Sequence, residues 1–107
     1  MERSLVERIR TFISVGDRYL EKGNLELACD SYLDALYALA VLIAYRDTGR
    51  LMPLRELRPF LSVKYPDVGR LIEKYSEMPS FDGLTASALR DEVTTLMGMM
   101  SLPSPEE

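Results

Sequence analysis

The chain has 107 residues, the size of one ordinary domain, and 47% of them are apolar, which is enough to fill one core. Its formal net charge is −4, and it contains one cysteine and no histidine. A single cysteine excludes an internal disulfide, and we therefore expect a cytoplasmic protein. The N-terminal residues MERSLVERIR alternate charged with apolar side chains, so we expect no secretory signal.

The first predicted helix covers residues 4–22. Its apolar residues recur at steps of three and four, which places them on one helix face. These residues are Leu5, Ile9, Phe12, Gly16, Tyr19 and Leu20. Gly23 suits the left-handed position that ends many helices. Asn24 can cap the next helix because its side-chain oxygen accepts a free backbone N–H. We therefore predict that the chain turns back on itself here.

The second predicted helix, residues 25–46, is the long central helix. Its first half is amphipathic and its second half is apolar nearly all round, so we expect other helices to enclose it. The longest apolar run, residues 35–44, would rise only about 15 Å as a helix, half the thickness of a bilayer core. We interpret it as a buried core helix and predict no membrane span. Gly49 ends the helix.

Prolines divide the next part of the chain into shorter helices. Pro53 can start a short helix, because proline suits the first helical position. Pro59 would shorten, kink or break that helix, since proline cannot donate an interior backbone hydrogen bond. Pro66 starts the next helix, and a last helix is predicted over residues 85–100.

No stretch of the sequence shows the sustained alternation of a strand. We therefore predict an all-α fold, an antiparallel four- to five-helix up-and-down bundle with a long central helix. Residues 1–101 would form this single domain. Residues 102–107, LPSPEE, would form a disordered acidic tail.

The hairpin of residues 12–35 resembles a single tetratricopeptide repeat. The matching positions are Phe12, Val15, Gly16, Tyr19, Gly23, Ala28, Tyr32 and Ala35. Small residues at Gly16 and Ala28 would let two helices approach closely, and the aromatic residues would fill the remaining gaps. The chain departs from the repeat at Ala40, where a proline is usual, and no second copy follows. A solenoid needs several stacked repeats, so we interpret the hairpin as the packing unit of one bundle.

A broader resemblance, over about residues 10–80, is to the HEPN family of small helical bundles. In that family a hairpin of the form "ylekGnyelA" leads into a long alanine-rich helix, a glycine, a proline-bearing loop, a short helix and a helix that begins with proline. The matching positions are Tyr19–Ala28, Tyr32–Ala44, Gly49, Pro53, Leu57, Leu61, Pro66 and Leu71. A short archaeal domain with a similar tyrosine- and alanine-rich hairpin is a third resemblance.

Active HEPN proteins carry an arginine followed four to six residues later by a histidine, which serves RNA cleavage, and this chain has no histidine. The resemblance therefore implies a non-catalytic member of the family. Such members pair with themselves or with a nucleotidyltransferase-type partner.

The residue types present also argue against catalysis. Without histidine the chain has no Ser–His–Asp or Cys–His unit and no imidazole metal ligand. Cys29 lies beside Ala28 in an amphipathic helix, which favours a packing role. Glu26, Asp30 and Asp34 lie four residues apart and could bind a divalent cation, but no Glu-x-x-His segment completes such a site. A solvated acidic stripe explains them, and we predict no enzymatic activity, cofactor or metal site.

Residues 46–70 form a basic segment with six basic and three acidic side chains, whereas the rest of the chain sums to −7. Such a segment can contact an anionic partner, or it can be an ordinary solvated surface. The residues predicted to face an anion or a partner are Arg50, Arg55, Arg58 and Lys64. The alternative function that follows is an RNA- or nucleotide-binding domain.

Three methionines, Met97, Met99 and Met100, cluster at the end of the last predicted helix. Adjacent helix positions cannot all face one core, so we expect at least one of them on the surface, where an adaptable side chain suits binding. We therefore predict an interface at these three residues. The predicted function is a dimeric, non-catalytic protein–protein interaction module that is HEPN-like and associates with itself or with a nucleotidyltransferase-type partner.

Overall fold

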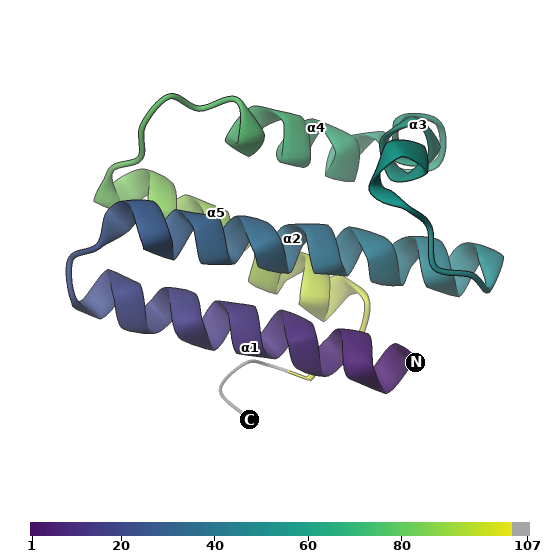
Figure 1. The fold of residues 1–107 in the computed structure, drawn as a ribbon, viewed down its shortest axis with the longest axis horizontal. Coiled ribbons are helices and arrows are strands. Elements are labelled where there is room, and N and C mark those ends of the chain that lie inside the picture. The colour runs from purple at the N-terminus through teal and green to yellow at the C-terminus, as the bar shows by residue number, and fades with distance from the viewer. Residues whose placement is uncertain (104–107) are drawn as a thin grey trace.

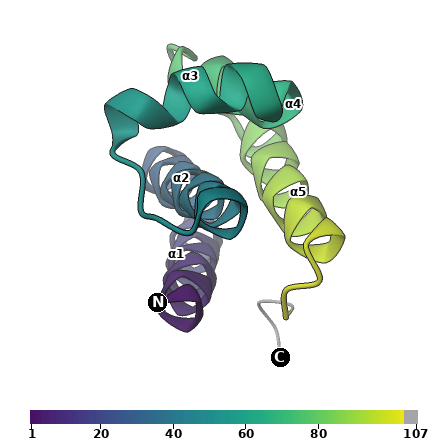
Figure 2. The same ribbon diagram turned by 90° about the vertical axis from the view of Figure 1, so that its right-hand side faces the viewer.

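The computed structural model describes residues 1–103, and over these residues it contains five α-helices and no β-strand. The helices are α1 (Glu2–Glu21), α2 (Leu25–Thr48), α3 (Leu54–Lys64), α4 (Pro66–Ser76) and α5 (Gly83–Met99). This confirms the predicted all-α fold. Helices α1 and α2 form an antiparallel hairpin, α4 runs along the other side of α2, and α5 packs on a third side (Figures 1 and 2).

Helix α2 is the centre of the molecule and contacts each of the other four helices. Buried residues occur on most of its circumference, which explains why the sequence of its second half is apolar nearly all round. By length and composition α2 is also long enough to cross a membrane, a property that it shares with core helices of this kind. Most of its surface is covered by the neighbouring helices.

The turn between α1 and α2 has the geometry that its sequence predicts. Gly23 has φ of 76°, in the left-handed region, and the Asn24 side chain accepts a hydrogen bond of 3.2 Å from the backbone N–H of Leu27. At Gly16 the chain lies directly against the ring of Tyr32 on the other helix. A Cβ atom at this position would lie 2.5 Å from Cε1 of the buried Tyr32 ring, so a side chain here would force the hairpin apart.

Helix α3 departs from the up-and-down order. It is seen end-on in Figure 1 and lengthwise in Figure 2, so it lies across α2, whereas α1 and α4 run along α2 and α5 crosses it obliquely. Pro59 lies inside this helix, which is short, as predicted, but continuous from Leu54 to Lys64. Pro53 occupies the N-cap, one position before its predicted place, whereas Pro66 begins α4 as predicted.

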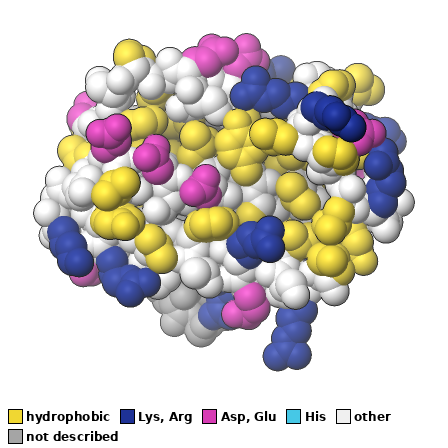
Figure 3. All heavy atoms as spheres, viewed as in Figure 1, with side chains coloured by type: hydrophobic (Ala, Val, Ile, Leu, Met, Phe, Trp, Pro, Cys, Tyr) yellow, Lys and Arg dark blue, Asp and Glu magenta, His cyan; other side chains and the backbone are white. Residues whose placement is uncertain are grey.

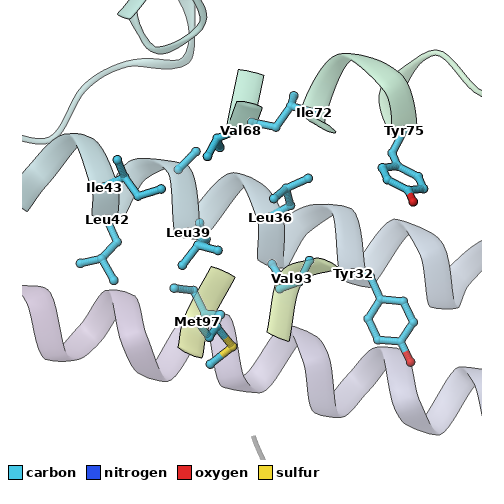
Figure 4. Close-up of a cluster of buried hydrophobic side chains, with 14 of the residues drawn as sticks. Tyr32, Leu36, Leu39, Leu42, Ile43, Val68, Ile72, Tyr75, Val93 and Met97 are labelled. Carbon is cyan, nitrogen blue, oxygen red and sulfur yellow. The ribbon is translucent and has the colours of Figure 1, made fainter. Parts of the chain in front are cut away.

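The core is one cluster in which side chains from α2, α4 and α5 meet (Figure 4). At the end of α5, the backbone N–H of Leu102 donates a hydrogen bond of 2.9 Å to the carbonyl of Met97, and the Leu102 side chain packs on this core. The predicted tail therefore does not begin at Leu102. Its last four residues, 104–107, lie outside the described part of the chain.

Candidate functional site

A partly buried polar junction joins α1, α2 and α5. The hydroxyl of the fully buried Tyr32 donates a hydrogen bond of 2.5 Å to Oδ1 of Asp17. Arg90 donates to both oxygens of the same carboxylate, from Nε at 2.7 Å and from Nη2 at 3.0 Å. Burial, together with the Asp17 hydrogen bond and charge, raises the pKa of Tyr32 well above its ordinary value. These groups satisfy one another, so we assign the junction to folding rather than to chemistry.

A second junction holds α3 and α4 against α2. The hydroxyls of Tyr37 and Ser76 lie 3.1 Å apart, and Nη2 of Arg58 donates a hydrogen bond of 3.3 Å to Tyr37. Burial alone would raise the pKa of Tyr37, but the hydrogen bonds with Ser76 and Arg58 and the charge of Arg58 lower it below its ordinary value. Arg58, which the sequence placed in the anion-facing set, therefore takes part in a contact between helices.

The basic segment of residues 46–70 is largely neutralised within the molecule. Four of its six cations form ion pairs, and these are Arg46–Glu2, Arg50–Glu56, Lys64–Asp47 and Arg70–Asp67. Of the four predicted anion-facing residues, Arg50 and Lys64 are thus paired with carboxylates, and Arg58 is bonded to Tyr37. Arg55 is exposed and has no ion pair among residues 1–103. This pairing argues against the segment as a site for a polyanion.

The methionines at the end of α5 divide between core and surface. Met97 is 1% exposed and lies in the core, so the prediction that it belongs to an interface is wrong for the single chain. It occupies the same helix face as the buried Val93, four residues earlier. Met99 is 77% exposed and Met100 is half-buried. Only these two of the three remain available to a partner.

Met99 and Met100 line a groove between the end of α5 and the start of α4, with a cavity of about 380 Å³. Its other residues are Ile43, Lys64, Tyr65, Pro66, Asp67, Val68 and Leu96. Figure 2 faces this end of the molecule, and Figure 4 shows two lining side chains, Ile43 of α2 and Val68 of α4, at the edge of the core. The lining is mainly apolar, and the charged Lys64 and Asp67 contribute side chains of opposite sign. The cavity lies within the size range of pockets that hold a ligand or a few side chains.

Neither the cysteine nor the carboxylates form a reactive centre in the described part of the chain. Cys29 is buried, and burial, with the charges of Asp30 and Asp82, raises the pKa of its thiol to about 11. The thiolate, which is the reactive form, is therefore scarce at neutral pH. Over residues 1–103, no group of three or more histidine, cysteine, aspartate or glutamate side chains is arranged to hold a metal ion.

No family model, curated protein or solved structure matches this chain. The resemblances to the tetratricopeptide repeat and to the HEPN family therefore stay predictions. The features of the molecule that bear on function are the groove between α4 and α5 and the charged surfaces.

Proposed function

We propose that this chain is a non-catalytic helical association module that pairs with a second copy of itself through the groove between α4 and α5. The observation that carries the proposal is Met99, which is 77% exposed beside an apolar groove on the last turn of α5. Removing such a side chain and such a groove from water favours association. The flexible, unbranched methionine can adapt its shape to the surface that it meets.

The charges at the groove support a second copy as the occupant. Lys64 and Asp67 have opposite signs, so this region is close to neutral although the whole chain carries −4. In a twofold pair each contact occurs twice, with residue roles exchanged. Lys64 of one copy can therefore meet Asp67 of the other, in exchange for their intramolecular partners Asp47 and Arg70, and the reverse contact forms at the same time. A partner with a strong net charge of one sign would be repelled by either Lys64 or Asp67.

A further exposed apolar residue precedes a groove residue in the sequence. Val63, the residue before Lys64, is 81% exposed. A stable interface of standard size buries about 800 Å² on each partner. The described chain exposes 6241 Å², so a contact of this size would cover about one eighth of it. The HEPN resemblance implies the same kind of association, with a second copy or with a nucleotidyltransferase-type partner.

Light scattering of the wild-type chain and of Met99→Glu tests this proposal. We expect the wild-type mass to approach that of a dimer as concentration rises from micromolar to millimolar. Met99→Glu should stay monomeric, because pairing would bury an uncompensated charge. Leu84→Glu is the matched control, since Leu84 is 84% exposed at the opposite end of the same helix.

Two outcomes would overturn the proposal. One is a wild-type chain that stays monomeric at every concentration. The other is a dimer that Met99→Glu and Leu84→Glu leave equally intact, which would place the interface elsewhere.

A further inference from the structure

The outer face of α1 carries cations that no carboxylate neutralises. Arg8 and Arg18 lie on α1, and Lys22 is the residue at its C-cap. Their separations of ten and four residues place all three on one side of the helix. None of the three forms an ion pair within residues 1–103. The cations of residues 46–70 differ in this respect, since most of them are paired.

An aromatic ring lies among these cations. A surface depression of about 290 Å³ is lined by Val15, Arg18, Tyr19 and Lys22. Tyr19 is half-buried, so its ring is held against the core while it also lines the depression. In Figure 3, dark blue side chains predominate over α1, whereas magenta side chains gather above it, over α2 and α4. Dark blue side chains also lie at the upper right of this view, around α3, but there most of the cations of residues 46–70 are paired with carboxylates.

We propose that this face of α1 binds single-stranded nucleic acid. Arg8, Arg18 and Lys22 contact backbone phosphates, and one unpaired base stacks beside Tyr19. Single strands are recognised in this way when cations follow the backbone and aromatic rings stack on bases, without sequence preference. An acidic polypeptide would satisfy the cations but has no base for the tyrosine, and a duplex keeps its bases stacked inside. This site shares no residue with the groove between α4 and α5.

The number of phosphate contacts fixes the expected dependence on salt. Each phosphate contact on a single strand contributes about −0.7 to the slope of log affinity against log salt, so three contacts predict a slope of about −2. The net charge of −4 opposes binding, and the measurement therefore belongs at low salt. Fluorescence anisotropy of a labelled single-stranded oligouridine gives both the affinity and the slope.

Variants of α1 separate the roles of charge and ring. The double variant Arg18→Gln/Lys22→Gln should reduce the magnitude of the slope by about 1.4, because two contacts are lost. Tyr19→Leu should weaken binding about tenfold and leave the slope unchanged, since stacking releases no counterion. Circular dichroism verifies that each variant is folded, and the two surface cations can be replaced without touching the core.

Arg55→Gln is the matched control, because Arg55 is another exposed, unpaired arginine, on α3. We expect it to leave affinity and slope unchanged. The proposal would be overturned by absence of binding at low salt, by a slope that Arg18→Gln/Lys22→Gln does not change, or by equal losses with Arg55→Gln. Competition by polyglutamate as effective as that by unlabelled oligouridine would also overturn it and would indicate an acidic polypeptide as the ligand.

Discussion

Single residues set how closely the helices of this bundle can meet. Gly16 leaves room for the ring of Tyr32, and Asp17, the next residue, accepts the hydrogen bond from that tyrosine's hydroxyl. The close approach was predictable, because a glycine on an apolar helix face suggests contact with a large side chain. The ion pair between Asp17 and Arg90 was not predictable, since these residues are 73 positions apart and the sequence gives no sign that they meet.

Asp34 gives a prediction about pH. Its side chain is exposed, but partial desolvation on helix α2 and the negative charge of Asp30 raise its pKa above the ordinary value of 3.8. A carboxyl group whose pKa is raised by folding binds protons more readily in the folded state, so its contribution to stability is fully present below pH 3.8 and is lost as pH rises through the folded pKa. Asp34→Asn should therefore raise the free energy of unfolding at pH 7.

Urea unfolding of both proteins, repeated at several pH values, would measure this effect. The gain from Asp34→Asn should disappear below pH 3.8, where the wild-type carboxyl is protonated in both states. A gain that is the same at pH 7 and at pH 3 would show that the ionised carboxylate is not its source.

At the scale of whole elements, the ends of α1 and α5 adopt the same geometry with different residues. Gly23 has φ of 76° after α1, and Ser101 has φ of 59° after α5. In both places the next backbone N–H bonds back to a carbonyl five residues earlier, from Asn24 to Tyr19 and from Leu102 to Met97. Glycine adopts this conformation freely, whereas a side chain is strained in it.

Ser101→Gly should therefore stabilise the protein by about 0.5–1 kcal/mol, and Gly23→Ala should destabilise it by about 1 kcal/mol. Nothing lies within 4 Å of a Cβ built at Gly23, so its effect would come from backbone conformation and not from a clash. Thermal unfolding should show shifts of several degrees in opposite directions. Shifts of the same sign would mean that conformational strain does not govern these two positions.

Helix existence was more predictable than helix direction. Apolar spacing, Asn24 and Pro66 predicted where helices begin and which face is buried, and the structure agrees. The crossing of α3 over α2 was not predictable, because an apolar face does not specify the angle at which one helix lies on another. The contacts of Tyr37 with Arg58 and with Ser76, which hold α3 and α4 against α2, depend on that angle.

At the scale of the whole molecule, charge in the sequence and charge on the surface differ. Residues 46–70 look basic along the chain, but Arg46 pairs with Glu2, 44 residues away, and Lys64 pairs with Asp47. Arg8, Arg18 and Lys22 alternate with acidic residues in the sequence, and only the helical turn places these three on one face. The groove likewise combines residues of α2, α4 and α5 with the junction that precedes α4. Of its lining residues, the sequence predicted only Met99, Met100 and Lys64 as residues that face a partner.

The most direct test of pairing through this groove is a charge exchange at Lys64 and Asp67, measured by sedimentation equilibrium. Lys64→Glu and Asp67→Lys should each weaken the dimer about tenfold, because each change places like charges together twice across a twofold axis. The double variant restores opposite charges and should recover wild-type affinity. A wild-type chain that never dimerises, or a double variant as weak as the single variants, would contradict the account.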